Sequence, residues 1–137
     1  MIASSIWKQE QQFDAVGESG HHVALDGGAA HVAGPSPMEA VLMALCSCTS
    51  VDVVSILKKK REPLTGLTVS ATAEQAAEPP RVFTHIRLVY RVGGAVSHKA
   101  AEDAVALSKN IYCSVSKMLE KSARIEFAIE YENSPDA

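Results

Sequence analysis

The sequence predicts an α+β protein in which strands surround two helices. Two patterns carry this prediction: apolar and polar residues alternate over 67–73 and 82–92, as in half-buried strands, and apolar residues recur at helical spacing over 97–122. A third observation is the apolar run over 38–57, which is long enough for a helix. A chain of 137 residues can bury a core without metal or disulfide support, and we predict one domain over 1–137.

Strands are predicted at both ends of the chain and in its middle. Apolar residues among polar ones over 2–16, and a segment over 21–28 that ends in Gly-Gly, indicate an N-terminal group of strands. The alternating segments 67–73 and 82–92 predict a long hairpin around a Pro-Pro turn. Alternation over 124–131 predicts a last strand.

The first helix has clear signals at both ends. Ser36 is a suitable N-cap, Pro37 suits the first helical position, and Glu39 completes a capping box with Ser36. A basic run over 58–61 complements the negative end of the helix dipole, and Pro63 prevents continuation. We therefore expect a helix over about 37–60.

This helix is apolar nearly all round and, with the basic run after it, has the composition of a membrane span with a positive flank. Asp52 lies inside it, and a charge is costly within a membrane. The remaining strands and the second helix would also need this helix as their core. We therefore predict no membrane association and a helix buried on most sides, by its own chain or by another one.

Charge and composition narrow the function classes. The formal net charge is −3 with mixed signs along the chain, which gives no broad basic surface for nucleic acid. Residues 1–10 reach polar side chains before a signal-peptide core forms, so we predict a cytoplasmic location with all three cysteines as thiols. The five histidines lack metal-ligand spacing with other ligand types, so neither a metal nor a cofactor is predicted.

The candidate chemistry lies in two cysteines on separate helices, Cys48 and Cys113. One reactive thiol and one distant resolving thiol are the minimum for a disulfide-cycling enzyme, and an odd cysteine count argues against structural disulfides. Cys46 points about 200° away from Cys48 on the same helix, so these two cannot bridge. Its apolar surroundings predict a packing role. A disulfide within one subunit would join Cys48 or Cys46 to Cys113.

Charged neighbours give the two thiols different predicted environments. Lys109 and Lys117 lie one turn either side of Cys113, where their charge would favour the thiolate. A solvated helix face explains these lysines equally well. Asp52 lies one turn after Cys48 and would oppose its ionisation if the carboxylate points inward.

The sequence offers two predictions for the place of Cys113 in the second helix. Its apolar stripe contains Ile111, Val115 and Met118, and Cys113 lies off this stripe. Cys113 is therefore expected either to face an active-site cleft or to sit at a break near Asn110. A break would place the thiol at a helix N-terminus, where the dipole also favours the thiolate.

The two cysteine motifs resemble those of a known family. The run GPSPMEAVLMALCSCTSVDVVSIL over 34–57, together with YCSVSK over 112–117, resembles the OsmC/Ohr superfamily and most closely its YhfA-like branch. The resemblance covers essentially the whole chain. It implies a β-β-β-α-β-β-α-β chain with two central helices packed on antiparallel sheets, in an intertwined homodimer with active sites at the subunit interface.

The resemblance also implies an activity, because members similar to Ohr and OsmC reduce organic hydroperoxides. By this likeness Cys48 is the peroxidatic thiol, Cys113 resolves it as a disulfide, and an external dithiol of the lipoyl type restores both. The peroxidase members also use an arginine from the N-terminal strands and a glutamate at the start of the central helix. This chain has no arginine before Arg61, and Met38 holds the place of that glutamate, one position before Glu39.

Two functions therefore stay open. The first is a thiol-dependent hydroperoxide reductase, in which Lys8 or a histidine would replace the arginine, since thiolate activation needs a positive neighbour. The second is a dimeric protein without peroxidase activity, which binds an apolar or thiol-reactive ligand at the subunit interface or senses redox state through its cysteines.

Overall fold

The computed structural model describes residues 1–132. Backbone contacts divide the chain into two compact units, Met1–Met43 and Ala44–Ala137, and each is described by itself. The elements follow the predicted order of three strands, a helix, two strands, a helical segment and a final strand, which confirms the α+β fold. The prediction of one domain over 1–137 stays a prediction.

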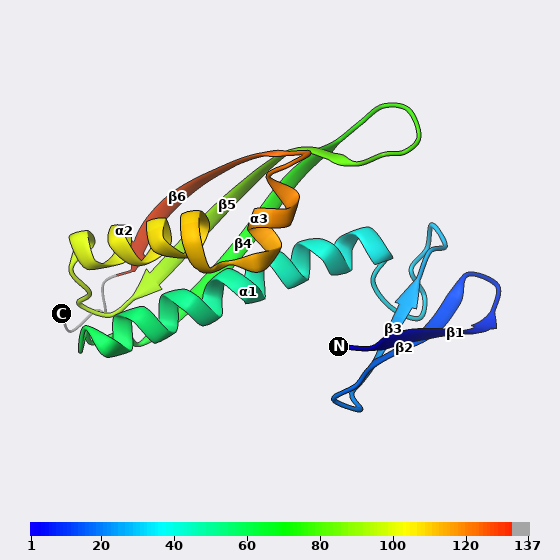
Figure 1. Ribbon diagram of the computed structural model, residues 1–137, viewed down its shortest axis with the longest axis horizontal. Helices are drawn as coiled ribbons and strands as arrows, with labels where there is room; N and C mark the ends of the chain where they lie inside the picture. The colour runs from blue at the N-terminus through cyan, green and yellow to red at the C-terminus, as the bar shows by residue number, and fades with distance from the viewer. Residues whose placement is uncertain (133–137) are drawn as a thin grey trace. The chain divides into compact units, whose positions relative to one another are not determined.

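The first unit contains an antiparallel sheet with strand order β1-β2-β3, which confirms the predicted N-terminal group of strands. Its strands are β1 (Ala3–Gln9), β2 (Gln12–Gly17) and β3 (His22–Asp26) (Figure 1). After β3, the Asp26 carboxylate accepts hydrogen bonds from the backbone N–H groups of Gly28, at 2.8 Å, and Ala33, at 3.0 Å. These bonds shape the loop that leads to the first helix.

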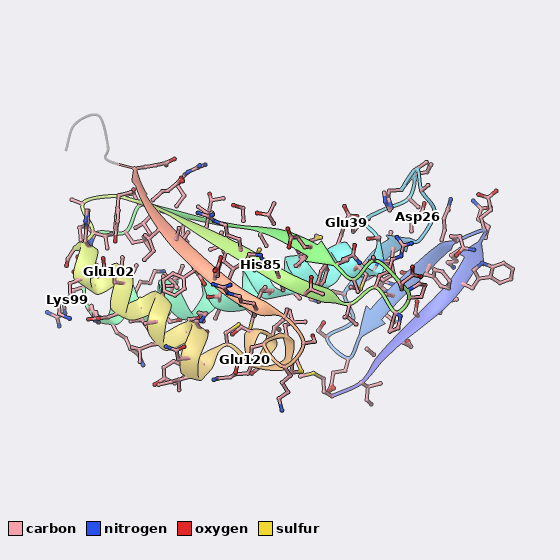
Figure 2. All side chains as sticks on the ribbon, turned by 90° about the horizontal axis from the view of Figure 1, so that it is seen from above. Asp26, Glu39, His85, Lys99, Glu102 and Glu120 are labelled. Atoms are coloured by element: carbon pink, nitrogen blue, oxygen red, sulfur yellow. The ribbon has the colours of Figure 1, made fainter. Side chains whose placement is uncertain are left out.

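Helix α1 (Pro37–Lys59) begins with the predicted capping box. The Glu39 N–H donates to Ser36 Oγ at 3.1 Å, and the Ser36 N–H donates to Glu39 Oε2 at 2.8 Å. Glu39 lies at this end of α1 in Figure 2. Its carboxylate therefore satisfies a backbone donor that the helix start would otherwise leave without a partner.

Only one stripe of α1 is buried within this chain. Met43 and Val51 are 55% and 66% exposed, so this chain alone does not bury the helix on most sides, and its burial by another chain stays a prediction. The helix is long and apolar enough to cross a membrane by length and composition, a test that core helices of soluble proteins also pass. The buried residues recur every four positions: Leu45, Thr49, Val53 and Leu57.

The second unit contains a mixed sheet with strand order β4-β5-β6. The hairpin of β4 (Gly66–Gln75) and β5 (Phe83–Gly93) is antiparallel, as predicted, but β6 (Arg124–Glu132) pairs with β5 in parallel. The predicted all-antiparallel sheets are thus corrected for this strand, because the helical segment between β5 and β6 is a crossover connection. Alternate residues of β5 are buried, and Figure 1 shows α1 and the helical segment covering one face of this sheet.

The helical segment between β5 and β6 is broken, as one of the two sequence alternatives predicted. Helix α2 (His98–Leu107) continues into a π-helical turn, η1 (Ser108–Tyr112), and α3 (Ser114–Leu119) follows. Cys113 lies between them with an extended backbone, at φ −75° and ψ 102°. Its N–H donates to the Ser108 carbonyl oxygen, five residues back, at 2.8 Å. Single π-turns of this kind are frequent at functional sites.

Candidate functional site

Cys48 and Cys113 lie together in the second unit. Cys113 is fully buried and Cys48 is half-buried, and neither forms a disulfide. Burial raises the pKa of the Cys113 thiol, a hydrogen bond donated by the Ser116 N–H to Cys113 Sγ at 3.4 Å opposes this shift, and the neighbouring Cys48 thiol raises the pKa further. The fold thus brings together two thiols that lie 65 positions apart in the sequence.

The two lysines flanking Cys113 contact other groups. Lys109 Nζ lies 5.8 Å from the centre of the Phe127 ring, and Lys117 Nζ lies 3.2 Å from Glu120 Oε1. Neither contact involves Cys113, and the prediction that lysine charge favours its thiolate stays a prediction. The side chains of Lys109 and Lys117 extend to groups at the surface, whereas the thiol points into the core, where loss of hydration favours its neutral form.

Cys46 lies on the other flank of the buried stripe of α1 from Cys48, as the helical geometry requires. It is half-buried and free, and burial raises the pKa of its thiol. A raised pKa lowers the fraction of the reactive thiolate at neutral pH. The packing role of Cys46 stays a prediction.

A chain of hydrogen-bonded side chains lies beside the thiols. Ser108 Oγ donates to Asp52 Oδ2 at 2.8 Å, Thr49 Oγ1 lies 2.7 Å from Ser108 Oγ, and Tyr90 Oη lies 2.7 Å from Thr49 Oγ1. Because Ser108 has one hydroxyl proton and gives it to Asp52, Thr49 must donate to Ser108, and Tyr90 must donate to Thr49. Each hydrogen bond of this series is therefore donated in the direction from Tyr90 toward the Asp52 carboxylate.

The sequence analysis included Asp52 but missed the three hydroxyl residues. Thr49, Ser108 and Tyr90 are each at most 1% exposed, and burial raises the pKa of Tyr90 to about 12, so its phenol stays protonated and able to donate. A signal was present: Thr49 occupies the apolar stripe of α1, spaced by four from Leu45 and Val53. A hydroxyl at such a position must find a buried partner.

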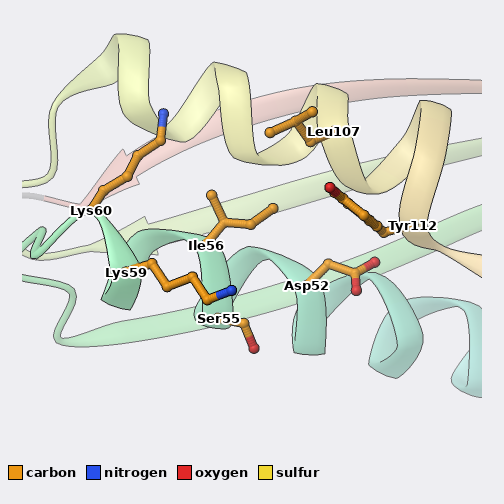
Figure 3. Close-up of a pocket in the computed structure, with 7 residues that line it drawn as sticks. All are labelled: Asp52, Ser55, Ile56, Lys59, Lys60, Leu107 and Tyr112. Carbon is orange, nitrogen blue, oxygen red and sulfur yellow. The ribbon is translucent and has the colours of Figure 1, made fainter.

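A cavity of about 440 Å³ opens beside this chain of side chains in the second unit. Figure 3 shows Asp52 and Tyr112 at one end, Lys59 and Lys60 at the other, and apolar side chains between. Tyr112 precedes Cys113, and Asp52 lies one helical turn after Cys48, so the cavity adjoins both segments that carry the thiols. Its lining residues are Asp52, Ser55, Ile56, Lys59, Lys60, Leu107 and Tyr112.

Glu39, the remaining candidate, belongs to the first unit, where its carboxylate takes part in the cap of α1. Across residues 1–132, no group of three or more histidine, cysteine, aspartate or glutamate side chains is arranged to hold a metal ion.

Residues 27–128 match the family model for OsmC-like protein. The chain belongs to the OsmC-like family. It is 43% identical over 131 residues to Protein YhfA of Escherichia coli, which covers 95% of this chain and 97% of that protein. The family assignment made from the two cysteine motifs is thereby confirmed.

Solved structures of similar fold extend these comparisons. A hypothetical protein from Aquifex aeolicus superposes with a TM-score of 0.88 at 28% identity, covering 97% of this chain and 96% of that one. The organic hydroperoxide resistance protein OhrB of Bacillus subtilis superposes with a TM-score of 0.67 at 13% identity, covering 95% and 98%. At that identity OhrB shows that this OsmC-like chain shares its fold.

Proposed function

We propose that this OsmC-like protein is a thiol-dependent reductase of organic hydroperoxides, with Cys48 as the peroxidatic thiol and Cys113 as the resolving thiol. The observation that carries the proposal is that a half-buried thiol, Cys48, neighbours a fully buried one, Cys113. A peroxide must reach the first thiol from solvent, whereas the resolving thiol needs to reach only the first. The hydroperoxide resistance named for OhrB, which has the same fold, supports this chemistry.

The proposed cycle has three steps. The Cys48 thiolate attacks the outer peroxide oxygen, the O–O bond breaks, and the organic alkoxide takes a proton and leaves as an alcohol, which leaves Cys48 as a sulfenic acid. The Cys113 thiol then attacks the Cys48 sulfur, so that a disulfide forms and the sulfenic oxygen leaves as water. An external dithiol of the lipoyl type reduces the Cys48–Cys113 disulfide by thiol–disulfide exchange. Both cysteine thiols are restored, and the external dithiol becomes a disulfide. Such chemistry suits the reducing cytoplasm.

We infer a preference for an organic peroxide from the cavity that adjoins the two segments carrying the thiols. Ile56, Leu107 and the ring of Tyr112 give it apolar walls, which hydrogen peroxide cannot use for binding. We therefore expect kcat/KM for an alkyl or aryl hydroperoxide to exceed that for hydrogen peroxide at least about tenfold, which corresponds to burial of two or three methylene groups. Peroxide consumption measured with a dithiol reductant checks this, and equal rates for both substrates would contradict it.

We also propose that the protein works as a homodimer. The family resemblance supports this, and so do the large apolar side chains that the isolated chain leaves exposed on α1 and the η1–α3 segment, namely Met43, Val51, Ile111, Tyr112 and Met118. An interface that covers them should bury well over ~2,000 Å², as in obligate dimers. Light scattering at micromolar concentration should give a dimer mass, whereas a monodisperse monomer would contradict the proposal.

A second candidate is a dimeric redox sensor or ligand-binding protein without turnover. The lack of an arginine before Arg61 favours this candidate, because thiolate activation needs a positive neighbour. A sensor would form the Cys48–Cys113 disulfide on one addition of hydroperoxide but would not turn over with a dithiol. Multiple turnovers per subunit would exclude it.

A further inference from the structure

Ser108 connects the two segments that carry the thiols. Thr49 follows Cys48 on α1, and its Oγ1 lies 2.7 Å from Ser108 Oγ. The carbonyl oxygen of Ser108 accepts the Cys113 N–H at 2.8 Å, which closes the π-turn. Ser108 thus binds the Cys48 segment through its hydroxyl and Cys113 through its backbone.

Because Thr49 and Ser108 are buried, their hydroxyl groups depend on each other for hydrogen bonds. Thr49 is 1% exposed and Ser108 is fully buried, so a hydroxyl that lost its partner would have no water to replace it. Asp52 accepts at one end of this series of hydrogen bonds and Tyr90 donates at the other. One arrangement of the hydroxyl protons therefore gives every hydroxyl a partner. Rotation or displacement of the π-turn would break at least one of these bonds.

We infer that Thr49 and Ser108 are positioning residues that hold Cys113 against Cys48 and thereby set the reduction potential of their disulfide. The inference rests on the proposed function only in taking these two thiols as the pair that forms the disulfide. Fixing two reacting groups raises the effective concentration of one toward the other, because the entropy of bringing them together is lost on folding. A higher effective concentration stabilises the disulfide and lowers its reduction potential.

The test measures this potential without peroxide. In a buffer of oxidised and reduced dithiothreitol, the two cysteine thiols lose two electrons and two protons, and the cyclic disulfide of the reagent takes them up to become a dithiol. The fraction of linked Cys48–Cys113 is read at equilibrium by alkylation and peptide mass mapping. Free thiols at Cys46 are counted in the same spectra.

Thr49→Val keeps the volume of the side chain and removes its hydroxyl, and Ser108→Ala removes the partner hydroxyl. Each is expected to lower the effective concentration about tenfold, which raises the potential by about 30 mV for a two-electron couple. Thr49→Ser restores the hydroxyl and should stay near wild type. Ser50→Ala is the matched control, because the Ser50 hydroxyl donates to the Cys46 carbonyl oxygen of its own helix, at 2.6 Å.

A reduction potential that is raised in Thr49→Val and unchanged in Thr49→Ser supports the inference. It does so even if the wild-type protein consumes no peroxide. Unchanged potentials in Thr49→Val and Ser108→Ala would overturn the inference while leaving the peroxidase proposal intact. A shift of equal size in Thr49→Ser would also overturn it, since packing volume would then be the cause. A wild type that forms no Cys48–Cys113 disulfide would overturn it together with the resolving role of Cys113.

Discussion

Cys48→Ser is expected to reduce the consumption of organic hydroperoxide by more than about a thousandfold, to the background rate, because the reaction loses its nucleophile. A serine hydroxyl is far less acidic than a thiol and is a weak nucleophile without an adjacent base. The substitution is nearly isosteric at a half-buried position, so the fold should persist. The measurement is the rate of peroxide loss with purified protein and excess dithiol.

Cys46→Ala is the matched control for this experiment. Cys46 lies two positions away on the same helix, is also half-buried, and points to the other flank of the buried stripe. Its replacement should leave turnover nearly unchanged, and the native thiol should react slowly with alkylating reagents, since burial raises its pKa. A loss of activity in Cys46→Ala that matches Cys48→Ser would reverse the assignment of the two cysteines.

The sequence predicted the elements because their local signals agree with the fold. The capping box of Ser36 and Glu39 forms as expected, and so does the long hairpin of alternating residues. The parallel pairing of β6 had no local signal, because an alternating strand reads the same in either direction. The sequence left open whether its own chain or another one covers α1, since composition shows that a helix is apolar but not which chain covers it.

The features of the candidate site that depend on local sequence could be predicted, whereas those that depend on contacts between distant residues could not. The break before Cys113 was one of two alternatives predicted from its position off the apolar stripe, which is local information. The hydrogen bonds between Thr49, Ser108 and Tyr90 join residues 41 and 59 positions apart, so only the tertiary fold reveals them. The contact of Lys109 with Phe127 could not be predicted either, because sequence spacing gives the face of a helix and not the group that a long side chain contacts.

Cys113→Ser is expected to abolish turnover with a dithiol while sparing the first reaction with peroxide. Cys113 is the N-cap of α3, and serine is among the preferred residues at that position, so the variant should keep the break and the helix start. A hydroxyl at residue 113 cannot form the disulfide, so Cys48 should accumulate as sulfenic acid or react further. Trapping with a sulfenic-acid reagent, followed by mass mapping, would detect this species.

In wild type, one equivalent of organic hydroperoxide should instead give a Cys48–Cys113 disulfide. The raised pKa of Cys113 fits this order of events: the buried thiol stays protonated and unreactive toward peroxide from solvent, and it reacts only once the neighbouring Cys48 presents an electrophilic sulfur. If Cys113→Ser keeps full turnover with a dithiol and wild type shows no such linkage, Cys113 is structural. The external dithiol would then have to attack the Cys48 sulfenic acid directly, through its exposed side.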